Sequence, residues 1–112
     1  MIPDERGTYV LVLQSTHEQS VLVGHLGTLI VCPGTYVYVG SALGPSGLRA
    51  RTNRHTSADK KKRWHIDYLL DVVRLIEIWY AVGMQKREHL WAKTIAGLPS
   101  ASVPMRGFGA SD

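Results

Sequence analysis

Apolar and polar residues alternate over short distances along most of this chain, which indicates several strands joined by tight turns. Val, Ile, Leu and aromatic residues fill the apolar positions, and Gly, Pro or polar residues interrupt them. The pattern predicts strands at residues 8–14, 21–24, 28–31, 35–39 and 75–82. Because strands connected this closely pair antiparallel, we expect a small, mainly antiparallel central sheet.

Three further segments have the spacing of helices and are expected to flank the sheet. Ser46 can cap a helix from residue 47 to about 56, although Gly47 weakens its first turn. Residues 64–72 predict a second helix. Residues 87–98 predict the clearest helix, and its buried stripe would consist of Trp91, Ala92, Ile95 and Leu98.

The whole chain, residues 1–112, is expected to form a single α+β domain. A chain of this length can bury roughly two-thirds of the surface that its unfolded form exposes. Residues 99–112 are rich in Gly, Ser and Pro and predict a tail. Cys32 is the only cysteine, which excludes an internal disulfide and suits a reducing compartment. The apolar runs are too short to cross a bilayer and no leader is visible, so we expect a cytoplasmic protein without a membrane partner.

Positive charge is concentrated in one part of the chain. Between residues 49 and 63, Asp59 is the only acid among the basic residues Arg49, Arg51, Arg54, Lys60, Lys61, Lys62 and Arg63. Such a segment suits a polyanion, bound through counterion release. For residues 60–63 taken alone, a solvated loop is the favoured interpretation. Arg51, Arg54 and His55 differ, because they lie at helical spacing beside a glycine turn.

Glu88 has an unusual position in the last predicted helix. One turn before Trp91 along the predicted buried stripe lies Glu88, so its carboxylate would point toward the interior edge. The alternative is that an acid in the first turn merely suits the positive end of the helix dipole. The sequence leaves both interpretations open.

Taken in order, these features resemble the GIY-YIG nuclease superfamily. Residues 7–9 (Gly-Thr-Tyr) are similar to its first tyrosine signature and residues 38–40 (Tyr-Val-Gly) to its second. Arg51, His55 and Glu88 follow in the expected order, and the match extends to about residue 98.

Three flanking segments narrow the resemblance to a small uncharacterised branch of that superfamily. They are residues 41–42 (Ser-Ala), 64–68 (Trp-His-Ile-Asp-Tyr) and 107–112 (Gly-Phe-Gly-Ala-Ser-Asp). Members of this branch occur alone or joined to endonuclease III-type repair proteins. The resemblance therefore also points to DNA repair.

The resemblance implies a divalent-metal-dependent endonuclease that hydrolyses DNA phosphodiester bonds, with branched or damaged DNA as the expected substrate. Tyr9 would act as the base or position the attacking water, and Tyr38 would orient phosphate or water. Arg51 would fork onto two phosphate oxygens. Glu88 would hold Mg²⁺ or Mn²⁺. His55 would be either a proton shuttle or a phosphate donor, and the sequence does not choose between them.

The expected DNA contacts are Ser41, Arg49, Arg54, Lys60, Lys61, Lys62 and Arg63. Ser41 replaces a lysine that often follows the second signature in the excision-repair relatives. The two signatures are farther apart than usual, so we expect an extra hairpin inserted within residues 14–34. The strand at 8–14 would still pair antiparallel with that at 35–39. A domain with one basic face usually needs a partner domain or a homodimer to select its target.

A nucleic-acid-binding module that keeps this fold without cutting is the alternative function. His65 and Asp67 form a second polar cluster that matches none of the superfamily's catalytic residues. Residues of this kind more often cap a helix or brace a loop.

Overall fold

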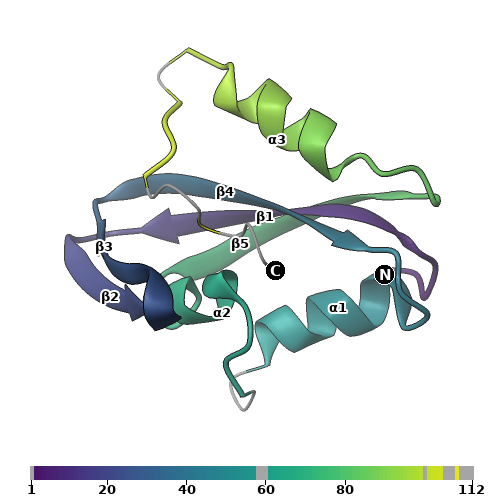
Figure 1. The fold of residues 1–112 in the computed structure, drawn as a ribbon, viewed down its shortest axis with the longest axis horizontal. Helices are drawn as coiled ribbons and strands as arrows, with labels where there is room; N and C mark the ends of the chain where they lie inside the picture. Colours follow the sequence, from purple (N-terminus) through teal and green to yellow (C-terminus); the bar gives the residue numbers. More distant parts are fainter. Residues whose placement is uncertain (1, 58–60, 100, 105–107, 109–112) are drawn as a thin grey trace.

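The computed structural model describes residues 2–57, 61–99, 101–104 and 108. Figure 1 shows its ribbon, with helices on both sides of a central sheet. Within the described residues the strands are β1 (Gly7–Ser15), β2 (Gln19–Val23), β3 (Gly27–Val31), β4 (Gly34–Ala42) and β5 (Arg74–Val82). The α-helices there are α1 (Gly47–Thr56), α2 (His65–Leu69) and α3 (Glu88–Ala96), and a short 3₁₀ turn spans Gly24–Leu26.

The central sheet has the order β4-β1-β5, and both pairings are antiparallel. In the first pairing, Tyr9 lies opposite Gly40 and Leu13 lies opposite Tyr36. Strands β2 and β3 pair with each other to form a separate hairpin between β1 and β4. The expected α+β fold, the β1–β4 pairing and the inserted hairpin are therefore confirmed.

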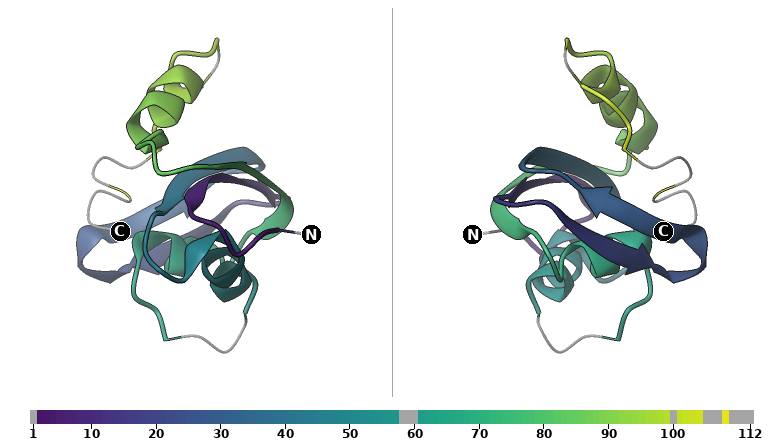
Figure 2. Two further views of the ribbon diagram at one scale, coloured as in Figure 1. Left: turned by 90° about the vertical axis from the view of Figure 1, so that its right-hand side faces the viewer. Right: turned by 90° about the vertical axis from the view of Figure 1, so that its left-hand side faces the viewer.

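The main core lies between the sheet and the helices α1 and α2. Successive β1 residues point to opposite faces, and Tyr9, Leu11 and Leu13 are buried on the face toward these helices. They pack in one cluster with Leu48 of α1 and Ile66 of α2. The hairpin extends this cluster with the buried side chains of Val23, Leu29 and Val31. Figures 1 and 2 show α3 on the other face of the sheet.

Helix α1 begins in a way that the sequence did not predict. The side chain of Ser46 makes no capping hydrogen bond, so its predicted role as a cap is wrong. Gly47 has φ of +73°, and a Cβ there would lie 2.0 Å from the carbonyl oxygen of Asp4. The N-terminal segment supplies the missing acceptors, because the Leu48 amide donates to Glu5 O at 2.8 Å. Gly47 is thus required for this close approach and is more than a weak helix residue.

The second helix is shorter than predicted. It ends at Leu69 and not at residue 72, because the amides of Val72 and Val73 both donate to the carbonyl oxygen of Leu69. The chain then turns directly into β5. Ile66 is nevertheless fully buried.

The third helix follows the predicted span closely, but its predicted buried stripe is wrong. Trp91 and Ile95 are only half-buried, while Ala92 and Leu98 are exposed. The physical reason is that α3 contacts the sheet chiefly through β4, at one edge. An edge strand offers too narrow a surface to cover a whole helix stripe.

Only part of the predicted tail is described. The ring of Phe108 packs against His65 with ring centroids 5.6 Å apart, while Met105 lies outside the described residues. Among all the residues that the structure describes, no helix is long and apolar enough to cross a membrane.

Candidate active site

A cleft of about 320 Å³ lies where β4 ends and the chain turns into α1. It is lined by Tyr9, Tyr38, Gly40, Ser41, Leu43, Gly44, Arg51, Trp64 and Glu88. Four of the five predicted catalytic residues therefore surround one hollow, although they come from β1, β4, α1 and α3.

Tyr9 forms the floor of this cleft and depends on a glycine for its position. Its side chain is only 1% exposed, and its ring lies against the backbone of Gly40 on the neighbouring strand. A Cβ at Gly40 would lie 2.4 Å from both Cζ and the hydroxyl oxygen of Tyr9. The glycine of the second signature thus makes room for the tyrosine of the first.

His55 lies behind Tyr9 and does not line the cleft. Its Nε2 is 2.7 Å from the Tyr9 hydroxyl oxygen, and the histidine is only 3% exposed. Its ring also lies close to those of Tyr38 and Trp64, at centroid distances of 6.3 and 6.0 Å. His55 therefore contacts Tyr9 and is not among the residues that line the cleft.

Arg51 is held at the mouth of the cleft from two sides. Its Nη1 donates a hydrogen bond of 3.0 Å to the carbonyl oxygen of Ser41. Its guanidinium carbon also lies 4.4 Å from the centre of the Trp64 ring, a cation–π contact. Trp64 therefore orients the arginine that we expect to meet the phosphate.

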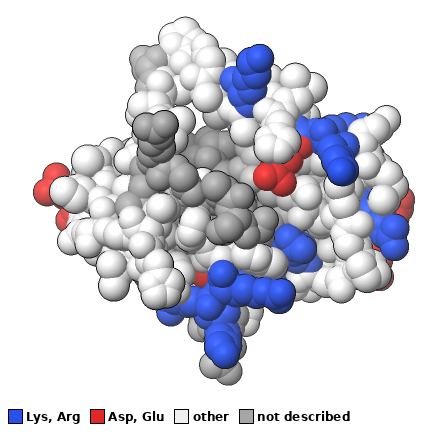
Figure 3. All heavy atoms as spheres, in the orientation of Figure 1, with Lys and Arg blue, Asp and Glu red and all other residues white. Residues whose placement is uncertain are grey.

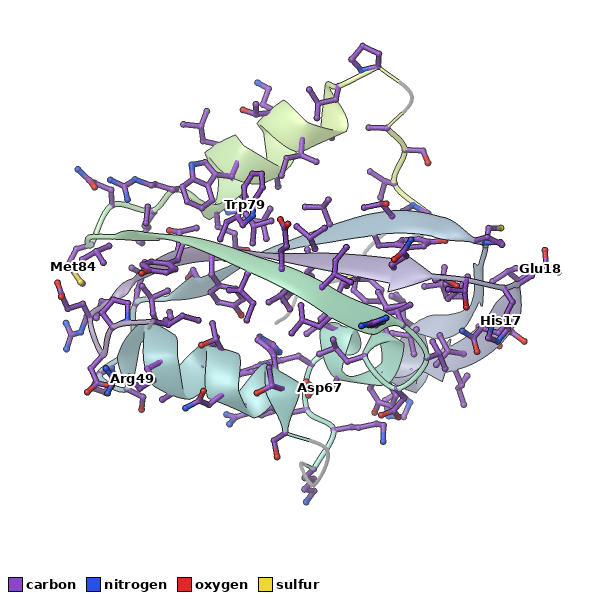
Figure 4. All side chains as sticks on the ribbon, turned by 180° about the vertical axis from the view of Figure 1, so that it is seen from behind. His17, Glu18, Arg49, Asp67, Trp79 and Met84 are labelled. Atoms are coloured by element: carbon purple, nitrogen blue, oxygen red, sulfur yellow. The ribbon has the colours of Figure 1, made fainter. Side chains whose placement is uncertain are left out.

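Trp64 is positioned in turn by a buried ion pair. Asp67 is fully buried and accepts two hydrogen bonds from the guanidinium of Arg54, at 2.8 and 2.7 Å. Its Oδ2 also accepts from the backbone amides of Arg63 and Trp64. The Arg54 guanidinium lies over the Trp64 ring at 4.1 Å. Figure 4 shows Asp67 between α2 and α1.

The ion pair changes the pKa of both partners. Burial raises the pKa of Asp67, but the hydrogen bonds from Arg54, Trp64 and Arg63 outweigh it and lower that pKa to about 2. The hydrogen bond with Asp67 raises the pKa of Arg54. Asp67 thus braces the loop before α2, as residues of its kind usually do.

The basic residues among the predicted DNA contacts differ in whether an acidic residue pairs with them. Arg49 and Arg54 are engaged within the fold, since Arg49 donates to Ile2 O at 2.9 Å and pairs with Asp4 at 3.2 Å. Lys62 pairs with Asp71 at 2.9 Å at the surface. Lys61 and Arg63 are exposed and have no acidic partner among the described residues, and Lys60 lies outside them.

A metal ion at this cleft would depend on Glu88. Within the described part of the chain, no cluster of three or more His, Cys, Asp or Glu side chains could hold an ion. Glu88 is half-buried and supplies the carboxylate in the cleft lining. Mg²⁺ is commonly held by one or two carboxylates with water and substrate phosphate as its other ligands. The donor set therefore fits a hard divalent ion that is completed by the substrate.

Sequence reasoning missed Trp64 as a residue of the site. An aromatic residue directly after a basic run was the available signal, because arginine side chains favour tryptophan faces. The spacing alone could not show that Arg51 and Arg54, one turn apart on α1, both reach this ring.

Comparison with known proteins matches residues 8–112 to the model of a family described as a domain of unknown function, DUF123. The matched range includes every residue that lines the cleft. Comparisons with curated proteins and with solved structures gave no match.

Proposed function

We propose that this chain, which belongs to the DUF123 family of domains of unknown function, is a divalent-metal-dependent endonuclease that hydrolyses DNA phosphodiester bonds. The observation that carries the proposal is the cleft in which Tyr9, Tyr38, Arg51 and Glu88 meet. Phosphodiester hydrolysis requires an activated water, neutralisation of the phosphate charge and help for the leaving oxygen, and two phenols, a guanidinium and a carboxylate around one hollow can supply these. The same set, in the same order, supports membership of the GIY-YIG superfamily.

Arg51 and Glu88 would deal with the negative charge of the phosphate. The planar guanidinium can donate to two non-bridging oxygens at once, which a lysine cannot do. Its hydrogen bond to Ser41 O and its contact with Trp64 hold the fork in place before the substrate arrives. When bound at Glu88, a divalent ion would supply Lewis-acid stabilisation of the developing charge.

Tyr9 and His55 would deal with the proton of the attacking water. A phenol with an ordinary pKa near 10 is a poor base at neutral pH, so Tyr9 needs a partner. His55 Nε2, 2.7 Å from the phenol oxygen, can take the phenol proton as the tyrosine receives one from water. The burial of both groups keeps this pair apart from bulk solvent.

The second candidate is a nucleic-acid-binding module that retains the fold without cutting. The observation in its favour is that, among the described residues that line the cleft, Glu88 alone has a carboxylate. Such a module would use the basic side chains of Lys61 and Arg63 for binding.

The remaining proposals follow from the nuclease. The proposed substrate is branched or damaged DNA, and the proposed location is the cytoplasm. The proposed process is DNA repair. A partner domain or a second copy of the chain would select the target, because the cleft itself has few groups that could read a base.

The test is a cleavage assay with linear, flapped and junction DNAs in Mg²⁺, Mn²⁺ or a chelator. We expect nicking that requires the metal and falls by at least about 100-fold in Arg51→Ala and in Glu88→Ala. Arg74→Ala and Glu18→Ala, which change exposed residues outside the cleft, serve as matched controls and should cut like the wild type.

Metal-independent nicking, or nicking that survives both cleft substitutions, would contradict the proposal. Binding that weakens with salt and survives Glu88→Ala, without any cleavage, would support the module instead.

A further inference from the structure

A second hollow, of about 450 Å³, lies in the loop between α1 and α2. It is lined by Arg54, Lys61, Lys62 and Arg63, and no acidic residue is among its described lining residues. Figure 3 shows Lys and Arg side chains gathered along the part of this face near α1 and α2. The chemistry of such a hollow suits an anion.

The four basic side chains of the second hollow differ in whether an acidic residue neutralises their charge. The Arg54 guanidinium is engaged with Asp67, and Lys62 pairs with Asp71. Lys61 and Arg63 are exposed and have no acidic partner among the described residues. The backbone of Arg63 is fixed, because its amide donates to Asp67 at 2.8 Å.

The second hollow and the cleft share a wall. Trp64 lines the cleft and directly follows Arg63, which lines the second hollow. Arg51 from the cleft and Arg54 from the second hollow both lie over the Trp64 ring, at 4.4 and 4.1 Å. The guanidinium of Arg63 also lies near this ring, at 5.6 Å, so the Trp64 ring contacts residues that line both hollows.

A ligand with consecutive phosphates is the kind that could contact both hollows at once. Along one DNA strand a phosphate follows roughly every 3.4 Å of helix axis, so a phosphate held at Arg51 has charged neighbours close by. An isolated phosphodiester has no such neighbours and could fill only one of the hollows.

We propose that Lys61 and Arg63 form a second phosphate site, which holds a strand phosphate on one side of the scissile linkage. This inference rests on the function proposed for the cleft, and it specifies the ligand as a strand with several consecutive phosphates. The bound strand then runs from the cleft past Trp64 to the basic loop. The site gives affinity without sequence preference, because it contacts only the backbone.

The experiment measures binding of a fluorescent single-stranded oligonucleotide in chelator at several salt concentrations, so that cleavage plays no part. Arg63→Gln and Lys61→Gln should each weaken binding several-fold at low salt and reduce the slope of log affinity against log salt by about 1. Arg74→Gln changes an exposed arginine at the start of β5 that lines neither the cleft nor the second hollow. This variant is the matched control and should keep the wild-type slope. Both loop side chains are exposed, so the variants should fold.

Equal slopes for Arg63→Gln, Lys61→Gln and Arg74→Gln would overturn the second phosphate site, whatever the cleavage assay shows. A reduced slope in the two loop variants would support it. If the two loop variants have a reduced slope but the wild-type protein does not cut DNA, the second phosphate site is supported and the proposed nuclease activity is contradicted.

Discussion

The two faces of the central sheet are packed very differently. On one face, Leu48 of α1 and Ile66 of α2 are fully buried in a continuous core. On the other, α3 has no buried residue, and its Leu90 is 64% exposed. Trp79 of β5, on the α3 side of the sheet in Figure 4, is 62% exposed.

This difference divides the candidate site into a fixed part and a loosely held part. Tyr9, Arg51 and His55 come from the packed face, where buried contacts and the Asp67 ion pair position them. Glu88 comes from the first turn of α3, which contacts the sheet chiefly through β4. The candidate site therefore combines three side chains that buried contacts hold in place with a carboxylate on a helix that has no buried residue.

The largest expected effect is the loss of the buried ion pair. Asp67→Ala removes the partner of Arg54 and the acceptor for two backbone amides, so it should lower the free energy of unfolding by about 3–5 kcal/mol. Asp71→Ala, which removes an exposed ion pair with Lys62, should leave the free energy of unfolding close to that of the wild type. Urea denaturation measures both. Similar losses for the two variants would show that the loop before α2 does not depend on Asp67.

A pair of leucine substitutions tests the packing of the two faces directly. Leu48→Ala, in a fully buried position of α1, should lower the free energy of unfolding by about 2–5 kcal/mol. Leu90→Ala, in an exposed position of α3, should change it by less than about 0.5 kcal/mol. Thermal and urea unfolding of both variants give the comparison. A large effect at Leu90 would mean that α3 is more tightly packed than its exposure indicates.

The smallest expected effect is a pH dependence of stability in the acid range. The pKa of Asp67 is lowered from an ordinary 3.8 to about 2, so its stabilising contribution is complete above about pH 4 and is lost as the pH falls toward 2. The difference between the two pKa values corresponds to about 2 kcal/mol. Asp67→Asn should lack this part of the pH dependence in urea denaturation between pH 2 and 5. An unchanged dependence in that variant would assign the acid sensitivity to other carboxyl groups.

Local patterns predicted the strands well, because each depends on residues that are close together. The alternation in β1 and the Gly and Pro residues between strands predicted the antiparallel strands, while the wide spacing of the two tyrosine signatures predicted the inserted hairpin. The start of α1 was different, because its acceptors come from the N-terminal segment, more than 40 residues away from Arg49 in sequence. The buried stripe of α3 failed for a similar reason, since its burial depends on how much of the sheet the helix covers.

The site was predictable in its residues but not in its internal contacts. The family resemblance assigned Tyr9, Arg51 and Glu88 to one reaction, and the structure brings them to one cleft. The hydrogen bond between Tyr9 and His55 and the contacts of Trp64 connect residues from different elements. No periodicity in the sequence encodes these contacts, because they arise only when α1 and α2 pack on the same face.

The central claim is that Glu88 completes a metal-dependent phosphodiester site with Tyr9 and Arg51. Its most direct test is a titration with paramagnetic Mn²⁺ that is followed by NMR. We expect selective broadening of the amide signals of Ser41 and Glu88, which line the cleft, while Ser15 at the far end of β1 stays sharp. The broadening should disappear in Glu88→Gln. Broadening that is uniform, or that persists at Ser41 in Glu88→Gln, would contradict the claim.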